Sequence, residues 1–241
     1  MAVFVLVHGG WCGKWVWELC VPGLEHAGHK VICPDLPGHG DNEPEALTRV
    51  NMKSHVEYIE KVLSNIKEPV ILAAHSMSGM IISQVAEDMP EKVKKLVYIA
   101  AFFPSENGQT MYPFIESDPW TQVGDKTIAA LENGMLMFVP AYARNLGFGM
   151  CRDQTFARVL ANAQPENPAL WYDPVTIGDN YHNTEKYYIH TMKDNCCTYY
   201  QQRVMVRNEP VVKEYYLEAD HGCMLSAPDE LNDALLDIAR V

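Results

Sequence analysis

Residues 70–80 read VILAAHSMSGM, and this stretch decides the fold. An apolar run of strand length ends abruptly at His75 and Ser76, and small residues follow. This pattern is typical of a strand-to-helix turn that exposes a serine nucleophile. The usual turn has glycines two residues before and after the serine, where this chain has Ala74 and Ser78. Both side chains are small enough for the turn to close. The alternative is an ordinary connection between a strand and a helix, in which Ser76 caps the helix.

Apolar runs of strand length alternate with segments of helical periodicity along the chain. The predicted strands are 3–7, 30–33, 70–73, 95–100, 186–190 and 211–217. Helical spacing of apolar residues marks 52–66, 80–89 and 231–238. The first four strands are apolar almost throughout, as strands covered on both faces are. We therefore predict an α/β fold with a mostly parallel central sheet and flanking helices.

The alternation breaks down between residues 103 and 185. This stretch is rich in aromatic residues, methionines and prolines, and it shows no clear strand. We predict a helical cap that folds over the carboxyl edge of the sheet, where open α/β sheets bind their ligands. Residues 1–102 and 186–241 would then form the core and 103–185 the cap insertion. The apolar cap residues either line a substrate pocket or pack the cap against the core.

Composition narrows the classes of partner and compartment. The chain has 241 residues, of which 48% are hydrophobic, and a formal net charge of -12. This size suits one domain with an insertion, and the acidic surface disfavours nucleic acid and anionic membranes as partners. The N-terminal apolar run is far shorter than a membrane span and reads as a buried strand. Seven cysteines in no metal-ligand pattern favour a reducing cytoplasm and no metal site.

A glycine-rich loop follows the first strand as His8-Gly9-Gly10. Glycines let a backbone N–H approach a carbonyl oxygen under attack, so we predict that the amides of Gly10 and Met77 form an oxyanion hole. Such a loop can also cradle phosphate, but the spacing of nucleotide-binding glycine motifs is absent.

A histidine and a carboxylate follow the last two strands. His221 comes after the final strand, from where it can reach over the sheet edge to Ser76 as a general base. Asp194 lies just past the preceding strand and is the predicted partner that orients His221. Asp220 and Glu106 are rivals for this role. The order serine, aspartate, histidine is that of the α/β-hydrolases.

The chain resembles the α/β-hydrolase superfamily, and within it the plant methyl esterases and hydroxynitrile lyases with their bacterial relatives. The resemblance runs nearly end to end, and its most specific segments are 8–17, 28–31, 35–40, 75–80, 220–221 and 224–228. It implies that Ser76 is the nucleophile, His221 the base and Asp194 its partner, with Gly10 and Met77 as oxyanion donors. No metal or organic cofactor is implied.

The lyase members carry two groups that this chain lacks. They have a threonine where this chain has Gly9, and a lysine directly after the histidine where this chain has Gly222. These groups handle the cyanohydrin hydroxyl and the departing cyanide. Their absence favours ester hydrolysis over cyanohydrin cleavage.

We therefore predict a serine hydrolase that cleaves small to medium carboxylic esters through an acyl-enzyme. The alternatives are a hydroxynitrile lyase or carbon–carbon bond hydrolase on the same triad, and a ligand-binding receptor with negligible turnover. The predicted substrate contacts are Gly9, Trp120, Phe138 and Met224. We expect a small-molecule ester as the partner and neither nucleic acid nor membrane, and a homodimer is compatible with the sequence.

Overall fold

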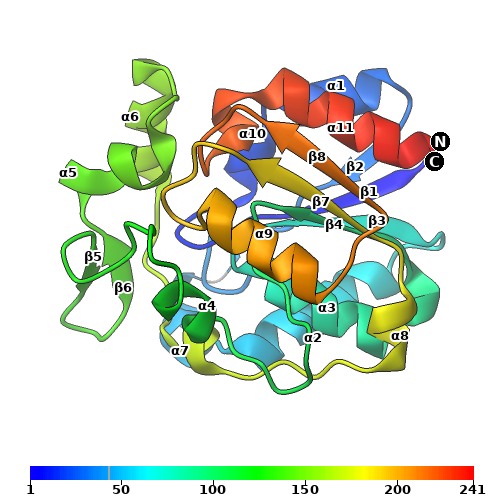
Figure 1. The fold of residues 1–241 in the computed structure, drawn as a ribbon, viewed down its shortest axis with the longest axis horizontal. Coiled ribbons are helices and arrows are strands. Elements are labelled where there is room, and N and C mark those ends of the chain that lie inside the picture. The colour runs from blue at the N-terminus through cyan, green and yellow to red at the C-terminus, as the bar shows by residue number, and fades with distance from the viewer. Residues whose placement is uncertain (43) are drawn as a thin grey trace.

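The computed structural model describes residues 1–42 and 44–241, without the side chains of Pro44 and Glu45. At its centre is a six-stranded sheet with the order β2-β1-β3-β4-β7-β8, in which every neighbouring pair is parallel (Figure 1). The strands are β1 (Val3–Val7), β2 (Lys30–Ile32), β3 (Val70–His75), β4 (Val93–Ile99), β7 (Lys186–Thr191) and β8 (Lys213–Leu217). The predicted parallel α/β fold is confirmed, and each predicted strand overlaps an observed one.

Helices cover both faces of the sheet. Figure 1 shows α2 (Met52–Ser64) and α3 (Ser78–Asp88) on one face, and α1 (Val21–His26) and α11 (Pro228–Arg240) on the other. The remaining α-helices are α4 (Tyr112–Glu116), α5 (Pro140–Ala143), α6 (Asp153–Asn162), α7 (Ala169–Tyr172), α8 (Asp179–Asn183), α9 (Tyr199–Asn208) and α10 (Cys223–Ser226). Short 3₁₀ turns occur at Lys14–Trp17, Pro44–Arg49 and Pro90–Lys92, and a π turn at Arg144–Phe148. Among the described residues, no helix combines the length and apolar character that crossing a bilayer requires.

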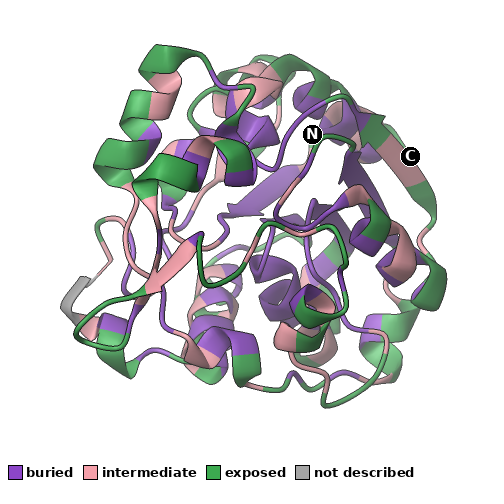
Figure 2. Ribbon diagram, turned by 60° about the vertical axis from the view of Figure 1, so that its left-hand side comes forward, coloured by how far each residue is buried: buried purple, intermediate pink, exposed green. Residues whose placement is uncertain are grey.

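The sheet separates two hydrophobic cores because successive strand side chains point to opposite faces. Along β1, Val5 and Val7 pack into the core under α2 and α3, whereas Phe4 and Leu6 pack into the core under α1 and α11. Figure 2 shows the strands buried between the two helical layers. This double coverage explains why the strands are apolar almost throughout.

The insertion between β4 and β7 lies beyond the carboxyl ends of the strands (Figure 1). It carries α4 to α8, as predicted, but it also holds a hairpin of β5 (Ile128–Ala130) and β6 (Leu136–Phe138). The expectation that this stretch has no strand is therefore wrong. The turn between the two strands contains Asn133-Gly134, with Gly134 at φ 80°, which is a strong hairpin signal despite the shortness of the strands. The division into core and cap stays a prediction.

We predict that Gly79→Ala lowers the free energy of unfolding by roughly 1–2 kcal/mol. Alanine gains about 1 kcal/mol in a helix interior, but overpacking costs about 1–3 kcal/mol. The clash should prevail because a Cβ at Gly79 would lie 2.1 Å from the carbonyl oxygen of Phe102, which belongs to the backbone. Urea denaturation would measure the change. Gly124→Ala is the matched control, since nothing lies within 4 Å of its Cβ position, and a Gly79→Ala protein as stable as the wild type would contradict the prediction.

Candidate active site

Ser76 lies on the sharp turn between β3 and α3, with φ at 56° in the left-handed region. A serine rarely adopts this conformation, so the surrounding backbone must hold it. The Ser76 N–H donates to the carbonyl oxygen of Ile99 at 3.3 Å. Its carbonyl oxygen accepts from the N–H groups of Gly79 at 3.1 Å and Phe102 at 3.0 Å. The turn is therefore fixed from both sides, as a nucleophile elbow requires.

The structure brings Ser76, His221 and Asp194 together in one hydrogen-bonded chain. Nε2 of His221 lies 3.0 Å from the hydroxyl oxygen of Ser76, and Nδ1 lies 2.7 Å from Oδ2 of Asp194. All three residues are buried. A proton can thus pass from the serine hydroxyl to an imidazole whose other nitrogen is held by a carboxylate.

Asp194 is held in place by four further donors. Its Oδ1 accepts from the N–H groups of Cys196 at 2.7 Å and Cys197 at 3.0 Å. Its Oδ2 accepts from the hydroxyl of Thr191 at 2.8 Å and the side-chain amide of Gln202 at 3.4 Å. The carboxylate therefore holds both the position and the tautomer of His221.

The electrostatic environment differs sharply between the two histidines near Ser76. Burial lowers the pKa of His221, but Asp194 and Cys196 together outweigh burial and raise this pKa well above its usual value. Burial holds the pKa of His75 well below its usual value. Nε2 of His75 donates to the carbonyl oxygen of His221 at 2.8 Å. His75 therefore stays neutral and braces the loop that carries the base.

The two rival carboxylates have other partners. Oδ2 of Asp220 accepts from the N–H of Met150 at 2.7 Å, and its Oδ1 accepts from the hydroxyl of Ser226 at 2.7 Å. Glu106 is exposed on a turn, where its N–H donates to the side chain of Gln109. Asp194 is the carboxylate that contacts His221.

The predicted oxyanion donors lie beside the nucleophile. Gly10 and Met77 line a cavity together with Ser76. Gly9 permits this approach, because a Cβ there would lie 2.6 Å from Nδ1 of His75 and 2.8 Å from Cβ of Ser76. Any larger residue at position 9 would push the loop away from the elbow.

Two narrow cavities meet at Ser76, each of about 20 Å³. One is lined by Gly10 and Met77, and the other by Phe138 and His221. A volume of about 20 Å³ is close to the space that one water molecule occupies. In this conformation each cavity accepts only a very small group beside the nucleophile.

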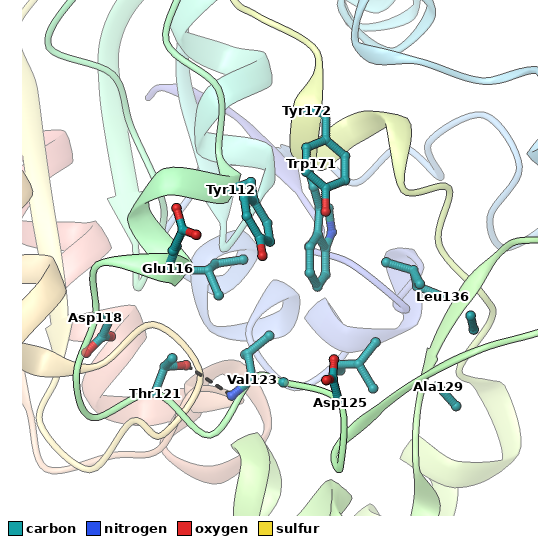
Figure 3. Close-up of a pocket in the computed structure, with 14 residues that line it drawn as sticks. Tyr112, Glu116, Asp118, Thr121, Val123, Asp125, Ala129, Leu136, Trp171 and Tyr172 are labelled. Carbon is teal, nitrogen blue, oxygen red and sulfur yellow. Dashed lines mark hydrogen bonds between the residues drawn. The ribbon is translucent and has the colours of Figure 1, made fainter.

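A larger cavity of about 630 Å³ lies in the insertion, between α4, α7 and the β5–β6 hairpin. Figure 3 shows Tyr112, Tyr172 and Trp171 at its walls. Ile115, Val123 and Trp171 line both this outer cavity and the inner one at Ser76. These three side chains therefore form a partition between the nucleophile and the outer cavity.

Of the four predicted substrate contacts, Phe138 lines a cavity that reaches Ser76. Gly9 instead lies behind the elbow, where it is buried against His75. Trp120 is 68% exposed and Met224 is 1% exposed within the core near α1 and α11, and neither lines the cavities at Ser76. Gly9, Trp120 and Met224 therefore do not line the cavities at Ser76. Trp120 is exposed to solvent, and Met224 packs in the core.

Trp171 is one of the insertion aromatics expected to line a pocket or pack the cap, and it lines the cavity at Ser76. The same cavity is also lined by three residues that the sequence did not indicate as substrate contacts, namely Trp11, Cys196 and Glu166. Trp11 directly follows Gly10 in the sequence, and this position next to a predicted oxyanion donor could have indicated that it lies near Ser76. Its backbone adopts φ 60°. Glu166 lies in the insertion within no recognisable motif, and only the fold brings it to the nucleophile.

Comparison with known proteins identifies relatives along nearly the whole chain. Residues 4–234 match the alpha/beta hydrolase family. Polyneuridine aldehyde esterase of Rauvolfia serpentina is 32% identical over 257 residues, covering 98% of this chain and 95% of the esterase. Methylesterase 9 of Arabidopsis thaliana is 30% identical over 258 residues, covering 99% and 98%. Putative methylesterase 11, chloroplastic, of Arabidopsis thaliana is 31% identical over 253 residues, and the match spans 99% of this chain but 64% of that protein.

Solved structures share the fold. The crystal structure of polyneuridine aldehyde esterase superposes with a TM-score of 0.86 at 26% identity, covering 99% of both chains. A methylesterase from Arabidopsis gives a TM-score of 0.84 at 22% identity, covering 100% of this chain and 99% of the other. These findings confirm the predicted superfamily, its methyl esterase branch and the fold, and the named esterases support the predicted carboxylic ester hydrolase.

We predict that Asp194→Asn lowers the pKa of His221, because the amide removes the negative charge that raises this pKa. Nuclear magnetic resonance titration of the imidazole in both proteins would measure the shift. The base is reactive only when neutral, so the acidic limb of any activity profile should move to lower pH in the variant. The maximal kcat of the variant, on the plateau of its pH profile, should be about 10⁴-fold lower than that of the wild type, the scale seen when a triad carboxylate is neutralised.

Glu106→Gln is the control for this prediction. It removes a carboxylate that is exposed on a turn, so it should leave both the pKa of His221 and the plateau unchanged. If Glu106→Gln caused the loss instead, the assignment of Asp194 would be wrong.

Proposed function

The chain belongs to the alpha/beta hydrolase family, and from this premise we propose that it hydrolyses small carboxylic esters with Ser76 as nucleophile, His221 as general base and Asp194 as its orienting partner. The observation that carries the proposal is the double contact of His221, at 3.0 Å to Ser76 and 2.7 Å to Asp194. A ligand-binding module gains nothing from an alcohol held against a base in this way.

The geometry supports a two-step reaction. The Ser76 oxygen attacks the ester carbonyl carbon while Nε2 of His221 takes the hydroxyl proton. The N–H groups of Gly10 and Met77 stabilise the negative charge that develops on the carbonyl oxygen. The tetrahedral intermediate collapses, and His221 gives its proton to the departing alkoxide, which leaves as the alcohol. Water activated by His221 then attacks the acyl-enzyme and releases the acid, restoring Ser76.

The cavities favour a substrate with one small side. Beside Ser76 there is space for a group no larger than about one water molecule. The outer cavity of about 630 Å³ can hold a larger, partly aromatic portion once the partition gives way. Several relatives are named methylesterases. We therefore propose a methyl ester, or another short ester, of a medium-sized acid as the substrate.

We also propose a reducing compartment, the cytoplasm, for this protein. All seven cysteines are free thiols, and six of them are buried. Disulfides are rare in reducing compartments, where thiols persist.

We predict that Ser76→Ala lowers kcat for ester hydrolysis by about 10⁶-fold, the scale of loss when a triad serine is removed from another serine hydrolase. The alanine protein should keep its circular dichroism spectrum and melting temperature, because the change removes one hydroxyl. A panel of methyl and p-nitrophenyl esters of graded acyl length would measure turnover. Mass spectrometry after treatment with a fluorophosphonate should locate a covalent adduct on Ser76 of the wild type.

Each alternative function gives a different result in the same panel. An adduct without ester turnover would favour a receptor. Faster conversion of a cyanohydrin or a diketone than of any ester would favour a lyase or a carbon–carbon bond hydrolase. Absence of an adduct would remove the serine hydrolase altogether.

We predict that Trp171→Ala raises kcat/KM for long esters relative to short ones by about tenfold, the lower end of the effect of one methylene group in a pocket. Trp171 stands in the partition, so its removal joins the inner and outer cavities. Tyr172→Ala is the matched control, since Tyr172 lines the outer cavity without lining the inner one. Equal changes in the two variants would contradict the role of the partition.

A further inference from the structure

Three buried side chains meet beside the inner cavity and take no part in the triad. Glu166 lines the cavity at Ser76, and His39 and His55 lie next to its carboxylate. All three are 0% exposed. A potential ligand atom from each lies within 4.8 Å of the other two, and no other such group of three occurs among the side chains of residues 1–42 and 46–241.

The second ring nitrogen, Nε2, of each histidine is buried and has no hydrogen-bond partner among the described residues. Nδ1 of His39 faces the carbonyl oxygen of Pro37 at 3.4 Å, and Nδ1 of His55 faces the carbonyl oxygen of Asn51 at 3.2 Å. A carbonyl only accepts hydrogen bonds, so each Nδ1 carries a proton, and in the neutral imidazole Nε2 then keeps its lone pair.

The Nε2 atoms of the two neutral imidazoles and the carboxylate of Glu166 thus lie close together in the protein interior. Burying two imidazole nitrogens without a hydrogen-bond partner is costly, so the group calls for a cation. A single proton shared between His39 and Glu166 would satisfy that pair, whose Nε2 and Oε2 lie 3.3 Å apart. It would leave the buried Nε2 of His55 without a partner.

We propose that His39, His55 and Glu166 bind one Zn²⁺ ion. Two imidazole nitrogens and one carboxylate oxygen are a ligand set that zinc commonly takes, and an imidazole must be neutral to bind it. Tetrahedral zinc with bonds of about 2.0–2.1 Å separates its ligand atoms by about 3.3 Å. Nε2 of His39 and Oε2 of Glu166 already lie 3.3 Å apart. Because the three ligand atoms lie within 4.8 Å of one another, a shift of at most about 1.5 Å would bring the third to the same ion.

The backbone around the site holds the ligands from independent directions. Glu166 exchanges two backbone hydrogen bonds with Leu136, at 2.7 Å and 2.8 Å. The N–H of His39 donates to the carbonyl oxygen of Leu36 at 2.9 Å, and His55 sits in the first turn of α2. The contacts of both Nδ1 atoms with backbone carbonyls are those that orient metal-binding histidines.

The site would act on the structure of the neighbouring loop. Oε2 of Glu166 accepts from the N–H of Trp11 at 3.4 Å, and Trp11 directly follows Gly10. An ion on Glu166 would therefore connect the insertion, α2 and the oxyanion loop. It would be a structural ion, because the triad performs its proton transfers without it.

Zinc binding to the whole protein tests this proposal. The wild type is stripped with EDTA, dialysed and titrated with ZnCl₂ by calorimetry, alongside His55→Gln and Glu166→Gln. His26→Gln is the control, because His26 is exposed on α1. Wild type and control should bind one equivalent and gain melting temperature with zinc. Both site variants should bind about tenfold or more weakly and lose the gain in melting temperature.

Cobalt replacement distinguishes these ligands from the seven cysteines. Co²⁺ at the proposed site should give visible d–d bands without the intense near-ultraviolet band of a thiolate ligand. Failure of the folded wild type to take up zinc would overturn the proposal and leave a shared proton between His39 and Glu166. Undiminished uptake by both variants, or a thiolate band, would overturn it as well. Circular dichroism establishes that each variant is folded, and Glu166→Gln serves should His55→Gln fail to fold.

Discussion

The parallel direction of the strands is the constraint on which this site depends. Because β3, β7 and β8 all run the same way, their carboxyl ends meet at one edge of the sheet. Ser76 directly follows β3, Asp194 follows β7 and His221 follows β8. The two hydrogen bonds of His221 can form only because the register places these three loops side by side. An antiparallel β7 would move Asp194 to the opposite edge.

The strands and the meeting of Ser76, His221 and Asp194 could be predicted from the sequence because their signals are local. Apolar runs such as Val3–Val7 and Val70–Ala74 are continuous in a strand buried on both faces. The fold then does the rest, since a parallel sheet brings every strand end to one edge. His221 and Asp194 were identifiable from their positions after strands, although 27 residues separate them in the sequence.

The insertion was less predictable, because its residues acquire their environment only through long-range packing. Trp120 and Phe138 look alike in the sequence as aromatic residues of this stretch. Trp120 is 68% exposed, whereas Phe138 is 2% exposed and lines a cavity together with His221. Glu166 gives no signal at all, since His39 and His55 come from distant segments. Gly9 shows the same limit at shorter range, because its fit against Ser76 depends on the pairing of β1 with β3.

The hairpin and helices of the insertion join two strands that are neighbours in the sheet, with Ile99 of β4 opposite Ile189 of β7. The entropy lost in closing such a connection grows only with the logarithm of its length, so doubling it costs about 0.6 kcal/mol. Growth or shortening of this connection therefore costs little in loop-closure entropy. The segment can diverge while Ser76, His221 and Asp194 keep their positions at the strand ends.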